Sequence, residues 1–303
     1  MNFGFFDDAH REYVITDPLI PVKWINSIGT PAFGGFVDHT GGALICTGDP
    51  RLDRITQYIS QLPDSDFKGE TLYLRMHSGD GRLIFSPFFV PTLTPMDHFE
   101  CSVGQGYSRW RTEVEGLCCE VTVFIPLDAP VEIRDVSITN LRDDTVEVDA
   151  VPVVEYAYPD GLQFHTADHS PLPMQSSAQT LDGRTVLLQS PATSRERPVN
   201  YFTASVTNSS FETDRRAFLG ANGYGSWQHP LALEDAELGN HQMLREDAIA
   251  ALLLRLGALP PGESTRFATL LGRAADLQDA RPIIQRYSRL EVIDAALIGL
   301  ARP

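Results

Sequence analysis

Two arginines three positions apart stand in a charged run between two apolar stretches of the chain. Arg51 and Arg54 lie in GDPRLDRITQYIS, residues 48–60, which Asp49 and Pro50 open with turn-forming chemistry. Guanidinium groups this close together can bind an anion such as a phosphate or a carboxylate. The same residues could instead hold a loop or face a partner, and the composition of the run leaves the three interpretations open.

A second candidate is HTADH, in which His165 and His169 are four positions apart and Asp168 lies between them. This spacing binds zinc when a helix places both rings on one face. Pro171 and Pro173 follow closely and no third ligand is evident, so the sequence does not predict a metal site. A sugar or polar contact from a loop and a solvated loop remain open for this motif.

Common catalytic motifs do not occur in the sequence. GANGYGS (220–226) lacks the Lys-Ser/Thr of a phosphate-binding loop, and there is no GxSxG element. A glycosidase needs one carboxyl group held protonated in a poorly solvated pocket. The paired carboxylates of this chain resemble turns or exposed strand ends instead: Asp7-Asp8, Asp143-Asp144 and Glu234-Asp235. No catalytic residue is therefore predicted.

The charge balance excludes several classes of partner. Acidic residues outnumber basic ones 40 to 24, and the net charge of -16 repels nucleic-acid backbones and anionic membranes. A neutral polyol is indifferent to this charge. The chain shows no signal peptide, and no apolar run approaches the ~18 residues of a membrane span. The four cysteines lack CxxC spacing, which predicts reduced core thiols and a cytoplasmic location.

Alternating apolar and polar residues predict β-strands over most of the chain. The clearest strands are expected at 117–126, 131–141, 145–158 and 249–272, the last as two strands around a PPGE turn. Strands with one buried face pack as antiparallel sheets in a sandwich. We therefore predict a mainly β fold, a large antiparallel β-sandwich over residues 1–273.

The apolar period changes to three and four near the end, which predicts a helical segment over residues 274–303. Asp276 or Asp279 can cap its start, and Pro282 suits its first turn. Either its apolar stripe folds back on the sandwich, or the chain is the front part of a longer protein, and the second is favoured. The stripe consists of Ile283, Ile284, Tyr287, Leu290, Ile293, Leu297 and Leu300.

Two long segments, 159–177 and 218–233, break the strand rhythm. Loops of this length in compact domains are usually functional or disordered. Phe164, Tyr224 and Trp227 gain from packing or stacking, which favours an ordered functional loop.

Seven phrases resemble, in order and spacing, the N-terminal portion of the inverting disaccharide phosphorylases of glycoside hydrolase family 94. They are FGFFDDAHREYVITDP (3–18), WINSIGT (24–30), DPRLDRITQY (49–58), FECSVGQGYSR (99–109), EVTVFIPLDAPVEI (120–133), DRRAFLG (214–220) and LGALPPGESTRFATLLG (256–272). PVKWINSIGT (21–30) resembles the cellobionic acid phosphorylase type of this family.

The resemblance implies a galactose-mutarotase-like supersandwich, followed by linker helices and an (α/α)6 barrel that carries the catalytic aspartate. In such an enzyme inorganic phosphate attacks the anomeric carbon of a β-linked disaccharide while the acid protonates the leaving oxygen, which yields α-glucose 1-phosphate. Residues 274–303 would be the first linker helix. These 303 residues would need no cofactor and would be catalytically silent alone.

The resemblance also implies that the sandwich forms homodimer contacts and shapes the acceptor-sugar site with a loop. The loop at 159–177 matches that position, so Asp160, Gln163 and His165 are expected to contact substrate. The family's glutamine corresponds to Gln163, but its arginine has no counterpart here. Arg51 and Arg54 are also assigned to the substrate channel, in a turn whose main role is structural and which Leu52 and Ile55 are expected to anchor.

Two other functions remain open. A free-standing mutarotase-like epimerase would need a histidine and a glutamate converging on one sugar, for which His165, His229 and Glu155 are available. A non-catalytic carbohydrate-binding protein would need only a sugar site.

Overall fold

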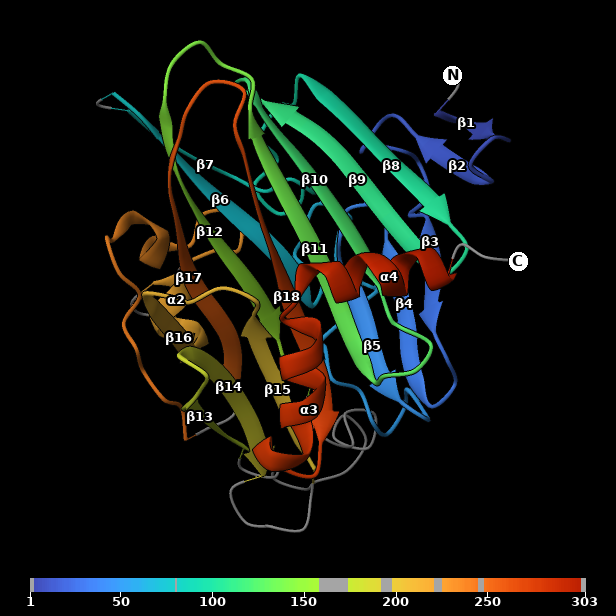
Figure 1. Ribbon diagram of the computed structural model, residues 1–303, viewed down its shortest axis with the longest axis vertical. Coiled ribbons are helices and arrows are strands. Elements are labelled where there is room, and N and C mark those ends of the chain that lie inside the picture. Colours follow the sequence, from blue (N-terminus) through green and yellow to red (C-terminus); the bar gives the residue numbers. More distant parts are fainter. Residues whose placement is uncertain are drawn as a thin grey trace.

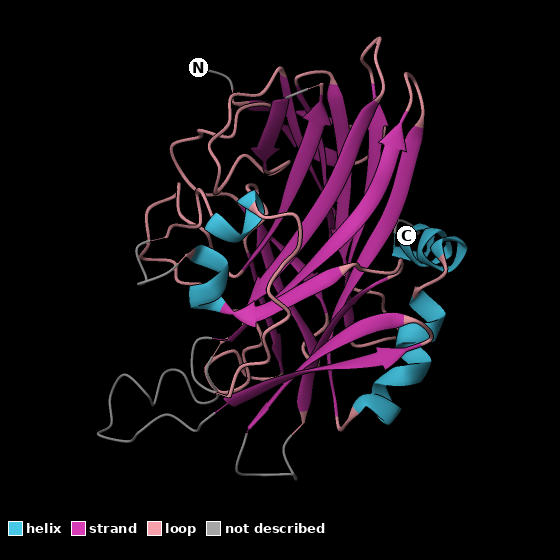
Figure 2. Ribbon diagram, turned by 90° about the vertical axis from the view of Figure 1, so that its left-hand side faces the viewer, coloured by secondary structure: helices cyan, strands magenta, loops and turns pink. Residues whose placement is uncertain are grey.

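The computed structural model describes residues 3–79, 81–157, 174–191, 198–220, 225–244 and 248–300. These residues form three sheets, and the two largest pack around a common apolar core, with helices on their outer faces (Figures 1 and 2). Every strand pair described is antiparallel. The antiparallel sandwich predicted from the alternating pattern is confirmed.

The spatial order of the strands defines the three sheets. The ten-stranded sheet runs β1 (Gly4–Asp7), β2 (Glu12–Ile15), β8 (His98–Gly104), β9 (Tyr107–Val114), β10 (Leu117–Phe124), β11 (Val131–Asn140), β18 (Ser264–Ala274), β15 (Val199–Ala204), β14 (Arg184–Pro191) and β13 (Met174–Leu181). The five-stranded sheet runs β16 (Ser210–Asp214), β17 (Ala248–Leu259), β12 (Val146–Glu155), β6 (Glu70–Ser78) and β7 (Gly81–Phe85). The three-stranded sheet runs β3 (Ile25–Gly29), β4 (Phe33–Asp38) and β5 (Ala43–Thr47).

The main core lies between the ten-stranded and five-stranded sheets. Trp110 on β9 is fully buried there, and its indole Nε1 donates a hydrogen bond to the backbone oxygen of His39 at 2.7 Å. All four cysteines are buried and free of disulfides, as the absence of CxxC spacing predicted. Burial raises the pKa of each thiol, which keeps it protonated and unreactive.

Two connections, from β11 to β12 and from β17 to β18, join the two large sheets and fix their relative position. β11 pairs with β18 in the ten-stranded sheet, and their continuations β12 and β17 pair in the five-stranded sheet. The buried Asn140 lies where the two connections meet, and its Nδ2 donates to the backbone oxygens of Asp144 and Leu259, both at 2.8 Å. One side chain therefore joins both connections.

The C-terminal helical segment contains two helices, α3 (Leu277–Tyr287) and α4 (Leu290–Leu300), where the sequence pattern indicated one. Asp276 caps α3 as predicted, because its carboxylate accepts from the backbone N–H of Asp279 at 2.9 Å. Pro282 lies in the second turn rather than the first. None of the described helices is long and apolar enough to cross a membrane.

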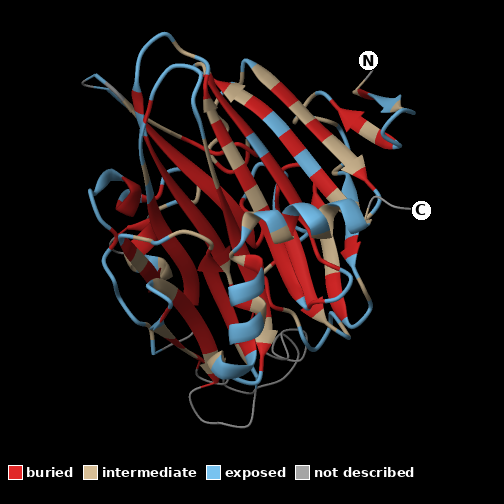
Figure 3. Cartoon of the chain, in the orientation of Figure 1, coloured by how far each residue is buried: buried red, intermediate tan, exposed pale blue. Residues whose placement is uncertain are grey.

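The apolar stripe of α3 and α4 packs on the outer face of the ten-stranded sheet (Figure 3). Ile284, Tyr287 and Ile293 are buried there against Ile133 of β11 and Leu270 of β18. The stripe therefore folds back on the sandwich, the first of the two alternatives. The outer face of the sheet is apolar at this point, and the two helices cover it.

On the opposite side of the molecule, α2 (Arg215–Leu219) and the 3-10 helix η2 (Leu231–Glu234) cover the outer face of the five-stranded sheet (Figure 2). Phe218 and Leu233 are buried there against Tyr73 of β6 and Ile249 of β17. This packing positions the segment between the two helices over the end of β12.

Replacing Asn140 with alanine should lower the free energy of unfolding by about 3 kcal/mol, because the backbone carbonyls of Asp144 and Leu259 lose their hydrogen-bond donor. The midpoint of chemical denaturation measures this change. Asp143→Ala, an exposed residue of the same turn, is the matched control and should change stability by under about 0.5 kcal/mol. Equal midpoints for the two variants would show that Asn140 does not hold the corner.

Candidate functional site

Two of the five residues predicted to contact substrate lie in described parts of the chain. Arg51 and Arg54 belong to the loop that follows β5, whereas Asp160, Gln163 and His165 lie outside the described residues. The HTADH motif lies outside them as well.

Both arginines hold their own turn. The exposed Arg51 forms an ion pair with Asp49, with 2.7 Å between Nη2 and Oδ2, and this hydrogen bond lowers the pKa of Asp49 to about 2. Arg54 donates from Nε to the backbone oxygen of Pro50 at 2.7 Å. Ile55 is fully buried and anchors the loop as predicted. Leu52 is 41% exposed, so the prediction that it is a second anchor is wrong.

Arg273, at the end of β18, ties this loop to the ten-stranded sheet. Its guanidinium donates to the backbone oxygen of Arg54 at 2.9 Å, to Oγ1 of Thr47 at 3.0 Å and to Oδ1 of Asn200 at 2.7 Å. The carboxylate of Asp53 lies 3.4 Å away. Burial lowers the pKa of Arg273, so these partners must offset the cost of burying its charge.

The cluster around Arg273 lies next to the two residues that border the undescribed segment 158–173. Arg54 and Arg273 line a small cavity of about 70 Å³ together with Ala157 and Met174. Ala157 follows β12 and donates its backbone N–H to the oxygen of Ile55 at 2.8 Å. Met174 begins β13. The loop predicted at 159–177 is wrong for its last four residues, which belong to β13, and its remainder lies outside the described residues. The Arg273 cluster borders the described ends of this segment.

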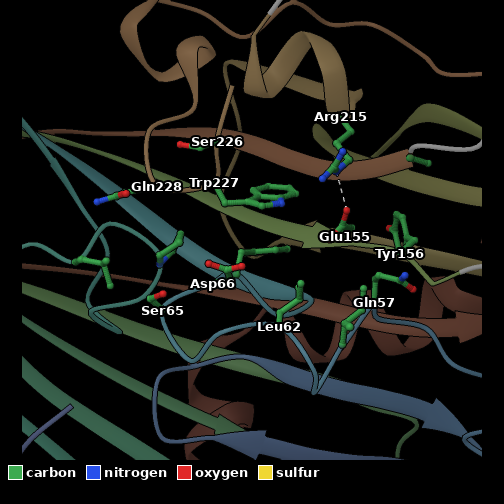
Figure 4. Close-up of a pocket in the computed structure, with 15 residues that line it drawn as sticks. Gln57, Leu62, Ser65, Asp66, Glu155, Tyr156, Arg215, Ser226, Trp227 and Gln228 are labelled. Atoms are coloured by element: carbon green, nitrogen blue, oxygen red, sulfur yellow. Dashed lines mark ion pairs between the residues drawn. The ribbon is translucent and has the colours of Figure 1, made fainter. Parts of the chain in front are cut away.

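A larger cavity, of about 540 Å³, opens beside the end of β12 (Figure 4). The loop before β6 supplies Gln57, Ser65 and Asp66 to its lining, and β12 supplies Glu155. Trp227 enters from the segment between α2 and η2. These three stretches, distant in sequence, thus meet around one space.

The aromatic part of this cavity is rigidly built. The ring of Trp227 stacks on the buried Phe67, with 3.9 Å between ring centroids and an 18° angle between planes. Its backbone oxygen accepts a hydrogen bond from the hydroxyl of Tyr73 at 2.6 Å, and Phe218 packs 6.1 Å from its ring. Trp227 is half-buried, so part of its ring faces the cavity.

An ion pair closes one side of the cavity. Nε of Arg215 lies 2.8 Å from Oε1 of Glu155, and its guanidinium lies 5.5 Å from the centre of the Trp227 ring (Figure 4). Asp214 orders the first turn of α2, because its carboxylate accepts from the backbone N–H groups of Arg216 and Ala217. That cap fixes the start of α2 and so places Arg215, its first residue, next to the carboxylate of Glu155.

Uncharged and acidic polar groups line the rest of the cavity, with Gln57 next to Glu155 (Figure 4). Among the described residues, the side chains of Gln57, Ser65, Asp66 and Gln228 form no hydrogen bonds with protein groups. Ser65, Asp66 and Gln228 are exposed and Gln57 is half-buried. These groups are therefore available to a ligand.

This arrangement is suited to binding rather than to acid–base chemistry. A general acid needs a protonated carboxyl in a poorly solvated pocket, but Glu155 is paired with a cation and Asp66 is exposed. The described residues contain no group of three His, Cys, Asp or Glu side chains able to hold a metal ion.

The residues considered for epimerase chemistry occupy different places. Glu155 lines the cavity, but His229 is exposed and its Nε2 lies 3.2 Å from Oε1 of Glu234. His165 lies outside the described residues. Sequence reasoning noted Trp227 as a stacking residue, and Arg215 lay in a family-like phrase, but nothing in the sequence indicated that they meet Glu155.

Comparison with known proteins identifies relatives along nearly the whole chain. The model of the glycosyl hydrolase 94 supersandwich domain matches residues 11–290. The chain is 29% identical to the N,N'-diacetylchitobiose phosphorylase of Vibrio furnissii, covering 99% of this chain and 37% of that protein. It is 27% identical to the solabiose phosphorylase of Paenibacillus borealis, covering 94% and 36%.

A more distant relative is the cellobionic acid phosphorylase of Neurospora crassa, at 23% identity over 68% of this chain and 25% of that protein. The chain therefore spans little more than a third of the length of the first two relatives. The match over residues 11–290 and the antiparallel sandwich agree: the chain belongs to glycoside hydrolase family 94, as its supersandwich domain.

Proposed function

We propose that this chain is the N-terminal sandwich of an inverting β-glucoside phosphorylase. The whole enzyme would catalyse reversible phosphorolysis of a β-linked disaccharide, with inorganic phosphate as the nucleophile and α-glucose 1-phosphate as a product. The family match over residues 11–290 carries this proposal. The three named relatives, which are phosphorylases of chitobiose, solabiose and cellobionic acid, support it.

Within that enzyme we assign the chemical step to protein outside this chain. Phosphorolysis by direct phosphate attack needs one general acid to protonate the leaving oxygen. In the larger cavity the carboxylate of Glu155 already pairs with the guanidinium of Arg215, with 2.8 Å between Oε1 and Nε. The sandwich would then contribute binding and assembly.

One contribution is the shaping of the acceptor-sugar site by the loop at 159–177. Asp160, Gln163 and His165 are its proposed contacts, with Arg54 and Arg51 at its base. The position of Ala157 and Met174 beside Arg54 and Arg273 supports this assignment. A loop that contacts substrate needs a rigid base, and Arg273 supplies three hydrogen bonds there.

A second contribution is the formation of a homodimer. Exposed apolar side chains gather near the edge strand β1, where Phe6 is 77% exposed. Tyr13 stacks on Trp24 and packs edge-on against Phe6, with 4.8 and 4.9 Å between ring centroids. Contiguous apolar surface of this kind is typical of protein–protein contacts. A cytoplasmic location belongs to the same proposal.

The activity can be tested with the complete product of the gene that contains this sequence. Incubated with inorganic phosphate and a panel of β-linked disaccharides, it should release a sugar 1-phosphate, which a coupled phosphoglucomutase assay or ³¹P NMR detects. The 303-residue chain should give no product, because the acid is supplied elsewhere. Anomer interconversion by the 303-residue chain would favour the epimerase alternative instead.

The role of Arg273 can be tested by Arg273→Ala. Hydrogen exchange in residues 48–57 should speed up about tenfold, corresponding to about 1.4 kcal/mol of lost local stability. In the complete enzyme, the KM for the acceptor sugar should rise more than kcat falls.

Arg266→Ala is the matched control, since Arg266 also lies on β18 but binds Asp135 and Asp294 on the other face of the sheet. It should leave both measurements near the parent values. If both variants behave alike, Arg273 has no specific part in supporting the acceptor loop.

A further inference from the structure

We propose that the cavity beside Trp227 is a binding site for a neutral pyranose sugar, on the outer face of the five-stranded sheet. Its volume of about 540 Å³ falls within the range of roughly 300–1,000 Å³ typical of small-ligand sites. This inference does not rest on the proposed phosphorylase activity. It concerns a site formed by this chain's own described residues.

The aromatic wall matches one face of a pyranose. A sugar ring presents a patch of C–H groups that packs on aromatic surface. Trp227 is stacked on Phe67 and lies 5.5 Å from the Arg215 guanidinium, so it offers a sugar the part of its ring that stays exposed to the cavity. The hydrogen bond from Tyr73 to the Trp227 backbone fixes this wall from below. A preformed wall reduces the entropy lost on binding.

Polar groups around the cavity match the hydroxyl groups at the edge of the same ring. Gln57 and Gln228, toward different ends of the cavity, each offer an amide donor and acceptor, and Asp66 offers two acceptor oxygens (Figure 4). None of the three side chains is engaged by another described group. A ligand that is apolar throughout would cover these groups without bonding to them, at a cost of about 1–3 kcal/mol for each.

The charges select a neutral ligand over an anion. Of the described lining residues, Arg215 alone is cationic, and Glu155 already pairs with it at 2.8 Å. Asp66 adds a second carboxylate, in a chain whose net charge is -16. A phosphate or a sugar phosphate would therefore meet a wall of like charge.

The decisive experiment titrates the 303-residue chain with glucose, N-acetylglucosamine and cellobiose, observed by saturation-transfer NMR and tryptophan fluorescence. We expect saturable binding of at least one of these neutral sugars and weaker binding of α-glucose 1-phosphate. Trp227→Phe should remove the fluorescence response, whereas Trp24→Phe, which alters an exposed tryptophan outside the cavity, should retain it.

A surface variant separates binding from folding. Asp66 is exposed, so Asp66→Ala should keep the parent melting temperature and weaken sugar binding about tenfold. Asp8→Ala, at another exposed aspartate, should leave the affinity unchanged.

The proposal is overturned if no neutral sugar binds at tens of millimolar, if Asp66→Ala binds as the parent does, or if the sugar phosphate binds more tightly. Each of these results would leave the phosphorylase proposal standing. Conversely, a complete gene product without phosphorolysis would leave this site intact.

Discussion

The arrangement of the two large sheets depends on the corner where the β11–β12 and β17–β18 connections meet. The strands on either side of this corner pair with each other in both sheets, so each sheet's position determines the other's. Asn140 donates hydrogen bonds to a carbonyl of each connection at this corner. An unpaired carbonyl there would cost about 1–3 kcal/mol, so substitutions at this corner are expected to destabilise the fold.

The far end of the same four strands carries both candidate binding regions. Glu155 pairs with Ile249 where β12 and β17 end furthest from Asn140, and Gly272 pairs with Val131 beside Arg273. The sugar-sized cavity and the Arg273 cluster are thus built on neighbouring strand ends. Rigid strands position the ion pair and the loop base, while irregular segments supply the surrounding groups.

Features that depend on local pattern could be predicted from the sequence. Alternation identified β10, β11 and β12, and the Asp276 cap followed from helix-start chemistry. The partner of the helix stripe could not be predicted, because the outer apolar face of β11 and β18 is recognised only when both strands are aligned. The cavity escaped prediction for the same reason: Gln57, Glu155 and Trp227 meet only in three dimensions.

Arg273 also determines when the loop after β5 can become ordered. Its contact with Thr47 joins residues 226 positions apart, and β18 is the last strand among the described residues. Closing so long a segment is entropically costly and occurs only after the intervening strands have assembled. The turn containing Arg51 and Arg54 therefore gains its hydrogen bonds from Arg273 late in folding. A chain in which β18 has not yet joined the sheet would expose a mobile, charged loop after β5.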